Sequence, residues 1–234
     1  MNILSLDTAL DMCSVAISID GSIVACQLRH SPKAQAEILF SLLENVFNQS
    51  VITPHQLDLI IATVGPGAFT GLRVGISTAR GISLATKTSC KGITTTEAIA
   101  QGVPHEKFDY APVLVALDSK RNDLFVQLFG PGRTPLGKVA AVEREKLSVW
   151  VREIISEGQV VQIIGNSSHV ASDLLKNDGL NSIVLKGSEM PDAREIAIIA
   201  FERWKLGIPL LELTPLYLRA PDAIIPLNQG QLRQ

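Results

Sequence analysis

The chain has 234 residues, of which 46% are hydrophobic and 19% are charged, and its formal net charge is −2. This composition is typical of a soluble globular protein with a well-filled core, and the length allows one large domain or two small ones. No apolar run approaches the roughly 18–20 residues of a membrane span, and the net charge gives no whole-chain attraction to nucleic acid.

The cysteines and the N-terminus indicate the compartment. Cys13, Cys26 and Cys90 form no CxxC pair, and an odd number argues against a disulfide framework. Residues 1–7 lack a basic segment and begin directly with a strand pattern, so we expect no signal peptide. Together these features predict a cytoplasmic protein, because thiols stay reduced there.

The opening of the chain predicts a three-stranded antiparallel meander. Residues 3–6 form a short apolar strand, residues 13–19 alternate apolar and small polar side chains, and residues 22–28 follow as the return strand. Asp20-Gly21 is typical of a type I′ hairpin turn, in which both central residues have positive φ.

The first strand ends at Asp7 and Thr8. A carboxylate and a hydroxyl at such a turn can face a metal-bound phosphate, as in a vestigial phosphate turn. The alternative is that both side chains cap the turn through local backbone hydrogen bonds. The sequence alone leaves both interpretations open.

A first long helix is predicted over residues 33–48. Its apolar stripe, at i, i+3, i+4 and i+7 spacing, consists of Ala36, Leu39, Phe40, Leu43, Val46 and Phe47. Ile38 and Leu42 widen this stripe beyond the roughly 100° that packing on one sheet requires. We therefore expect a second apolar neighbour, either another helix of this chain or a helix of another subunit.

A glycine loop follows the apolar strand of residues 59–64 and leads into a helix over residues 72–85. Its characteristic residues are Gly65, Pro66, Gly67, Phe69, Thr70 and Gly71. Free N–H groups at the start of the helix can bind an anion, with Thr70 as a capping residue. The alternative is that the glycines only allow a tight turn.

The second helix is rich in small residues. Gly75, Ser77, Ala79 and Gly81 lie within it, and each interior glycine costs about 1 kcal/mol relative to alanine. Close packing of another backbone is the usual compensation. Arg73 and Arg80 are seven residues apart and share a face, where they either hold an acidic partner or lie in solvent.

The second half repeats the layout of the first. After a strand at 92–94 and a helix ending at Ala100, the polar stretch 105–109 breaks the pattern. The later elements are strands at 112–118, 124–129 and 136–142, a helix at 143–157, a strand at 160–164, a helix at 169–176, a strand at 183–185 and a helix at 193–205. We predict a duplicated α/β fold with a lobe at 1–104, a degenerate lobe at 105–212 and a C-terminal tail at 213–234 whose end is frayed.

Candidate catalytic groups are few. No two of the four histidines have the i, i+3 or i+4 spacing of metal ligands on one helix, and neither a GxSxG elbow nor a Walker loop is present. Asp7 and Asp118 end corresponding strands, but the turn after Asp118 has no glycine and is a poor phosphate cradle. A small phosphotransferase or nucleotide hydrolase using Asp7, Thr8 and Asp118 is the alternative to a non-catalytic protein, and a metallopeptidase would need ligands that this sequence does not offer.

Three segments carry a resemblance to the bacterial TsaB family. They are Leu4-Ser5-Leu6-Asp7-Thr8 with Ser14-Val15-Ala16, the central Gly65-Pro66-Gly67-Ala68-Phe69-Thr70-Gly71-Leu72-Arg73-Val74-Gly75, and Pro215-Leu216-Tyr217-Leu218-Arg219. The resemblance implies the duplicated actin-like and sugar-kinase-like (ASKHA) fold. It further implies a non-catalytic scaffold for TsaD, which with the ATPase TsaE transfers threonylcarbamoyl from threonylcarbamoyl-AMP to N6 of adenosine 37 in tRNAs that read codons starting with A.

The resemblance also implies partners and an interface. TsaD relatives carry two metal-binding histidines on the first helix, which this chain lacks, and Ala34-Gln35-Ala36-Glu37 stands where TsaB relatives often show His-Ser-Glu. The first two long helices are expected to bind TsaD, or a second copy when TsaD is absent, through Leu39, Leu42, Leu43, Val46, Arg73, Ile76, Ser77 and Arg80. We expect no metal or cofactor of its own, at most a weak ATP or ADP contact at the complex interface, and contact with tRNA only through the complex.

Overall fold

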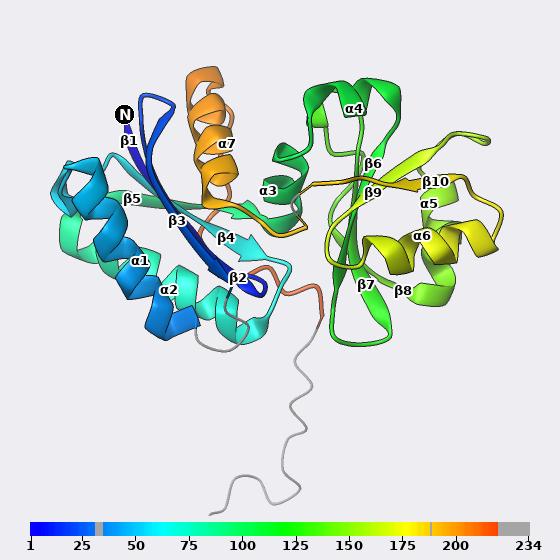
Figure 1. The fold of residues 1–234 in the computed structure, drawn as a ribbon, viewed down its shortest axis with the longest axis horizontal. Helices are drawn as coiled ribbons and strands as arrows, with labels where there is room; N and C mark the ends of the chain where they lie inside the picture. The colour runs from blue at the N-terminus through cyan, green and yellow to red at the C-terminus, as the bar shows by residue number, and fades with distance from the viewer. Residues whose placement is uncertain (31–34, 188, 220–234) are drawn as a thin grey trace, which may run out of the picture.

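The computed structural model describes residues 1–30, 35–187 and 189–219, which form two lobes that each contain a mixed five-stranded sheet (Figure 1). The first sheet has the order β3-β2-β1-β4-β5. Its strands are β1 (Asn2–Asp7), β2 (Met12–Ile19), β3 (Ser22–His30), β4 (Leu59–Gly65) and β5 (Ser89–Thr94). β1, β2 and β3 form the expected antiparallel meander, whereas β1, β4 and β5 run parallel.

The second sheet repeats this arrangement in the order β10-β9-β6-β7-β8. Its strands are β6 (Val113–Asp118), β7 (Asp123–Phe129), β8 (Ala140–Glu143), β9 (Val161–Ile164) and β10 (Ser182–Val184). Here too the central strand pairs antiparallel with the next strand of the chain and parallel with a later one. The duplicated actin-like architecture that the sequence predicts is therefore confirmed.

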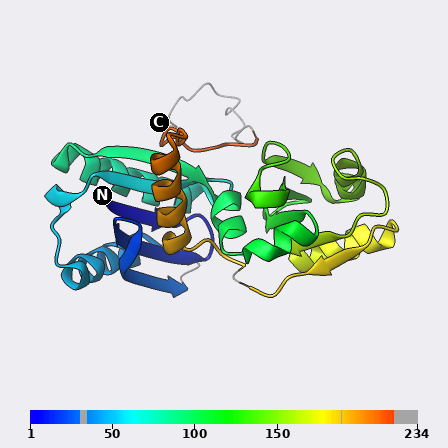
Figure 2. The ribbon, with the colours of Figure 1, turned by 90° about the horizontal axis from the view of Figure 1, so that it is seen from above.

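Helices cover both faces of the first sheet, as Figures 1 and 2 show. α1 (Gln35–Ser50) and α2 (Phe69–Thr86) pack on one face, and α3 (Thr95–Gln101) and α7 (Ala193–Leu206) pack on the other. β1 faces both layers because strand side chains alternate: Leu4 and Leu6 contact the α1–α2 side and Ile3 the α7 side. Within the described residues, none of the helices has the length and apolar character that crossing a membrane demands.

The second lobe has shorter helices. These are α4 (His105–Tyr110), α5 (Leu147–Arg152) and α6 (Ser168–Asn177), together with the 3₁₀ turns η2 (Pro131–Arg133) and η3 (Arg144–Lys146). A further 3₁₀ turn, η1 (Pro54–Gln56), precedes β4 in the first lobe. One buried cluster, with Leu72 and Ile99 on one side and Phe108 and Val115 on the other, joins the two lobes. This shared core places the carboxyl ends of β1, β4 and β6 around one interlobe space.

Helix α7 corrects one assignment. The predicted lobe limits group residues 193–205 with the second lobe, but α7 packs on the first sheet. Ile196, Ile199 and Ala200 are buried against Ile3 and Ile61, and Ser5 donates a hydrogen bond to the carbonyl of Ala193 (2.6 Å). Sequence order does not reveal this return, because an apolar helical stripe fits either sheet.

Three local predictions are also wrong. Residues 105–110 form α4 because Pro104 precedes the helix and Phe108 is buried in the interlobe core. The strand expected at 136–142 is limited to β8, and the helix expected at 143–157 is divided into η3 and α5, ending at Arg152.

The hairpin at Asp20 and Gly21 is confirmed by φ values of 49° and 83°. The expected start of the first helix and the frayed end of the tail fall on residues 31–34 and 220–234, outside the described residues.

Candidate functional site

Asp7 lies at the end of β1 with no exposed surface. Its Oδ1 accepts hydrogen bonds from the Thr63 hydroxyl (2.6 Å) and the Ala9 amide (3.2 Å), while its buried Oδ2 has no hydrogen-bond partner among the described residues. Burial raises the pKa of Asp7 to about 7, against the lowering effect of those two bonds. The Ala9 bond is the local turn cap that the sequence offered as the alternative to a phosphate contact.

The glycine loop is packed directly onto the turn that follows Asp7. A Cβ at Gly71 would lie 2.1 Å from the carbonyl oxygen of Thr8, one at Gly75 would lie 2.5 Å from the Thr8 hydroxyl, and one at Gly67 would lie 2.4 Å from the carbonyl oxygen of Ala9. Thr8 is buried and donates its hydroxyl hydrogen to the carbonyl of Gly71 (2.7 Å). These contacts favour the structural interpretation of both motifs: the glycines let α2 approach the turn, and Thr8 is covered by it.

Asp118 occupies the corresponding end of β6, in a different environment. Its Oδ1 accepts from the Lys120 amide (2.8 Å), and its Oδ2 pairs with the Lys120 ammonium (3.1 Å). Partial burial opposes ionisation of Asp118, but these bonds and the lysine charge outweigh it and hold its pKa below the usual range. Asp118 lines the interlobe cleft and Asp7 does not, so the two carboxylates do not face this cleft together as the paired-carboxylate hypothesis requires.

The interlobe cleft has a volume of about 750 Å³. Its walls come from the glycine loop and α2, from the turn after β6, and from residues 216–219. Phe69 and Tyr217 stack with ring centroids 5.7 Å apart, and both side chains are half-exposed. The guanidinium carbon of Arg73 lies 3.7 Å from the Phe69 ring centroid, and its Nε donates to the Tyr217 hydroxyl (3.1 Å).

The segment after α7 builds one wall of this cleft, which sequence reasoning missed. Figure 2 shows it running from the first lobe toward the second. Leu211 pairs with Gly92 of β5, the Leu216 amide donates to the Val64 carbonyl (2.7 Å), and Arg219 forms an ion pair with Asp123 of β7. The motif at 215–219 contributed to the resemblance, but nothing in its pattern indicated that Tyr217 and Arg219 face a cleft.

Most of the expected interface residues are in the protein's own core. Leu39, Leu42, Leu43, Val46 and Ile76 are at most 6% exposed and pack against the first sheet, so the expectation that they face a partner is wrong. Most of the wide apolar arc of α1 is taken up by its own sheet and by α2, whereas Phe40 is 65% exposed. Arg73, Ser77 and Arg80 are exposed, and Arg80 also donates to the carbonyl of Leu213 (2.6 Å).

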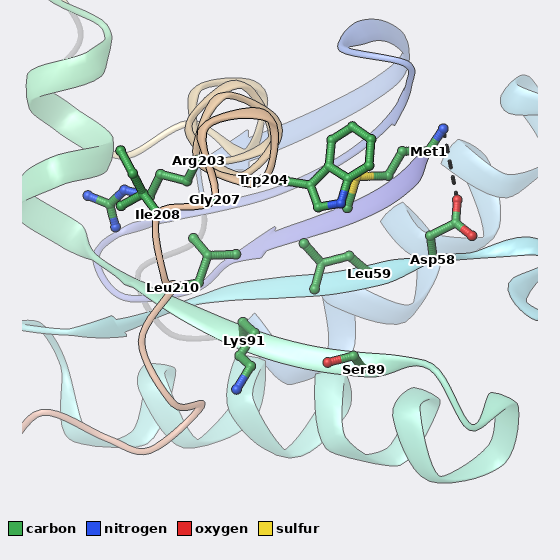
Figure 3. Close-up of a pocket in the computed structure, with 10 residues that line it drawn as sticks. All are labelled: Met1, Asp58, Leu59, Ser89, Lys91, Arg203, Trp204, Gly207, Ile208 and Leu210. Atoms are coloured by element: carbon green, nitrogen blue, oxygen red, sulfur yellow. Dashed lines mark ion pairs between the residues drawn. The ribbon is translucent and has the colours of Figure 1, made fainter.

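A second hollow, of about 660 Å³, lies between the end of α7 and the start of β4 and β5 (Figure 3). Trp204, Ile208 and Leu210 form its apolar side. Lys91 pairs with Glu212, Arg203 pairs with Glu97, and the terminal amine lies 3.9 Å from Asp58. The carboxylates around this hollow balance its cations, so it offers no excess positive charge to an ionic ligand. In the described ranges, no three His, Cys, Asp or Glu side chains come together as a potential metal site.

Comparisons with known proteins agree with this architecture. The family model described as "TsaD: tRNA N6-adenosine threonylcarbamoyltransferase" matches residues 29–199. The TsaB protein of Escherichia coli K12, named for tRNA threonylcarbamoyladenosine biosynthesis, is 25% identical over 94% of this chain and 95% of its own. The tRNA N6-adenosine threonylcarbamoyltransferase of Phytoplasma australiense is 35% identical over 34% of this chain and 29% of its own. A Pseudomonas aeruginosa structure described as similar to peptidase YeaZ superposes with a TM-score of 0.77 at 21% identity, covering 93% of this chain and 99% of that chain.

Proposed function

The chain belongs to the TsaD family of tRNA N6-adenosine threonylcarbamoyltransferases, and from this premise we propose that it is a TsaB-type, non-catalytic subunit in tRNA threonylcarbamoyladenosine biosynthesis. It binds a TsaD protein, with TsaE in the same cytoplasmic assembly, and supports transfer of threonylcarbamoyl from threonylcarbamoyl-AMP to N6 of adenosine 37 in tRNA. Full-length similarity to TsaB proteins, against partial similarity to a transferase, supports the subunit role over the transferase role.

The observation that carries the proposal is the closure of the phosphate turn. Asp7 is buried, Thr8 is bonded to Gly71, and Asp118 is paired with Lys120. A phosphotransferase would need accessible carboxylates to hold metal-bound phosphates. The chain keeps the two-lobed architecture, but the groups on which the rival enzymatic function depends are occupied by structural contacts.

The outer face of α2 supports a partner-binding role. Ser77, Gly81 and Leu84 follow i, i+4, i+7 spacing, and Leu84 is 72% exposed. A Cβ at Gly81 would meet no atom of the described residues within 4 Å, so packing within that part of the chain gives no reason for an interior helix glycine. Close approach of a helix from TsaD, or from a second copy when TsaD is absent, would supply that reason. Arg73 and Arg80 flank this face.

Leu84→Glu tests the proposed face. We expect the variant to fold normally, because Leu84 is exposed, and to lose at least about tenfold in affinity for TsaD, since a charge would be buried in the interface. Co-purification and titration calorimetry with TsaD provide the measurement. Leu206→Glu, at an equally exposed leucine on α7, is the matched control and should bind as the wild type does. Equal binding by both variants would exclude this face.

The enzymatic rival has its own test. If the chain were a phosphotransferase or nucleotide hydrolase, the isolated chain would turn over Mg-ATP and Asp7→Asn would abolish that turnover. We expect no turnover above a heat-treated control. In reconstituted tRNA modification with TsaD and TsaE, we expect threonylcarbamoyl incorporation to require this chain, with Asp7→Asn as active as the wild type.

A further inference from the structure

The interlobe cleft is positively charged although the chain as a whole is not. Of the residues that the structure describes, four cationic side chains line it, Arg73, Lys120, Arg121 and Arg219, against the carboxylates of Asp11 and Asp118. Even with Asp123, which pairs with Arg219, cations remain in excess, whereas the whole chain has a formal charge of −2. A concave wall of one sign focuses the field and attracts anions to this place rather than to the surface in general.

An aromatic platform stands at the same cleft. Phe69 is 51% exposed and Tyr217 is 47% exposed, although they stack on each other and Arg73 lies over Phe69. Exposed, stacked rings held rigidly by an arginine offer a π surface on which a base can stack, and such platforms bind unpaired nucleotides with little dependence on sequence. Phe125 and Leu72 add apolar walls deeper in the cleft.

Among the described residues, neither the turn after β1 nor the turn after β6 offers a cradle for a polyphosphate. The turn at Asp7 and Thr8 is filled by α2 through Gly71 and Gly75, and the turn at Asp118 is closed by its own bonds to Lys120. A single phosphodiester needs only one or two cations beside the base, whereas a metal-bound triphosphate needs a continuous cradle. The chemistry therefore matches a nucleotide within a strand better than free ATP.

We propose that this cleft binds an unpaired nucleotide of an RNA strand, with the base on the Phe69–Tyr217 platform and the phosphate beside Lys120 and Arg121. This inference deepens the proposed function and rests on it for the identity of the RNA, a tRNA loop. It assigns to this subunit a direct contact with RNA, in place of the purely indirect contact that the sequence suggested. Apart from Arg73, which lies beside both, the binding surface does not share residues with the outer face of α2, so variants at Tyr217 and Leu84 test the two proposals separately.

The test is fluorescence anisotropy of the purified chain with a labelled RNA hairpin that carries an unpaired loop. We expect the hairpin to bind more tightly than the same sequence closed into a duplex, and excess AMP or ATP to compete poorly. Tyr217→Ala should weaken binding about tenfold, the effect of losing one stacked base, and Tyr217→Phe should retain it. Lys120→Gln should weaken binding and reduce its dependence on salt concentration.

Matched controls lie outside the cleft. Tyr110→Ala, at an exposed tyrosine at the end of α4, and Lys176→Gln, at an exposed lysine on α6, should leave RNA affinity unchanged. The proposal is overturned if the chain fails to bind the hairpin at low salt, binds duplex equally well, loses equal affinity in the controls, or is competed by ATP as effectively as by unlabelled hairpin. Tyr217→Ala should still co-purify with TsaD, whereas Leu84→Glu should still bind RNA, so each result reports on one proposal.

Discussion

Gly71→Ala is expected to destabilise the protein by about 3 kcal/mol or more, since the new methyl group would lie 2.1 Å from the carbonyl oxygen of Thr8. That oxygen belongs to the backbone of a buried turn and cannot move aside as a flexible side chain would. If the turn and α2 moved apart to make room for the methyl group, the hydrogen bond from the Thr8 hydroxyl to the Gly71 carbonyl would lengthen. Urea unfolding followed by far-ultraviolet circular dichroism gives the free energy of unfolding.

Gly81→Ala, in the same helix, is the control. In the part of the chain that the structure describes, a Cβ there meets nothing within 4 Å, so the substitution should stabilise the chain by up to about 1 kcal/mol through helix propensity alone. If Gly71→Ala were as stable as Gly81→Ala, the close packing of the glycine loop on the Thr8 turn would be refuted.

Asp7→Asn is expected to stabilise the protein at pH 8 by about 2 kcal/mol. The pKa of Asp7 is about 7 in the folded chain, against 3.8 for an ordinary aspartate, so the folded state binds the proton more tightly than the unfolded state does. Stability therefore falls as pH rises from about 4 to about 7 and is level above that, with about 4 kcal/mol lost in all. The amide is never charged, but leaving its buried N–H groups without acceptors costs about 1–3 kcal/mol and offsets part of the gain.

The pH dependence of the free energy of unfolding separates the loss of the Asp7 charge from any pH-independent effect of the substitution. In the wild type, the free energy of unfolding should decline between pH 5 and pH 7, and in Asp7→Asn this decline should be much smaller. Asp173→Asn, at an exposed carboxylate on α6, should follow the wild type at every pH. A wild-type profile that rises over this interval would show that Asp7 is ionised and stabilised in the folded state.

The sequence predicts the layout of this fold well, because its strongest signals are local. The alternation of residues 13–19, the Asp20-Gly21 turn and the apolar run before Gly65 each determine one element, and the repeat of this order in the second half predicts the duplication. The sequence does not indicate α4, because the polar stretch 105–109 is typical of a break between elements, although the proline at 104 is compatible with a helix start.

The candidate site was harder to predict, since it depends on which layers meet. The stripe of Leu39, Leu43 and Val46 is equally suited to a partner helix and to the chain's own sheet, and burial decides for the sheet. Tyr217 reaches Phe69 and Arg73 from almost 150 residues away in sequence, and Arg219 reaches Asp123 in the other lobe. No periodicity records such contacts, because they depend on the return of the chain to the first sheet.

That return has a consequence for the order in which the protein is made. The ribosome delivers the five strands of the first sheet early, but Ile3 and Ile61 stay uncovered until Ile196 and Ala200 have been synthesised. Nascent chains commonly fold domain by domain from the N-terminus. Here the half that is translated first is the one that must wait, because this face of its sheet lacks the α7 cover while the second half is being synthesised.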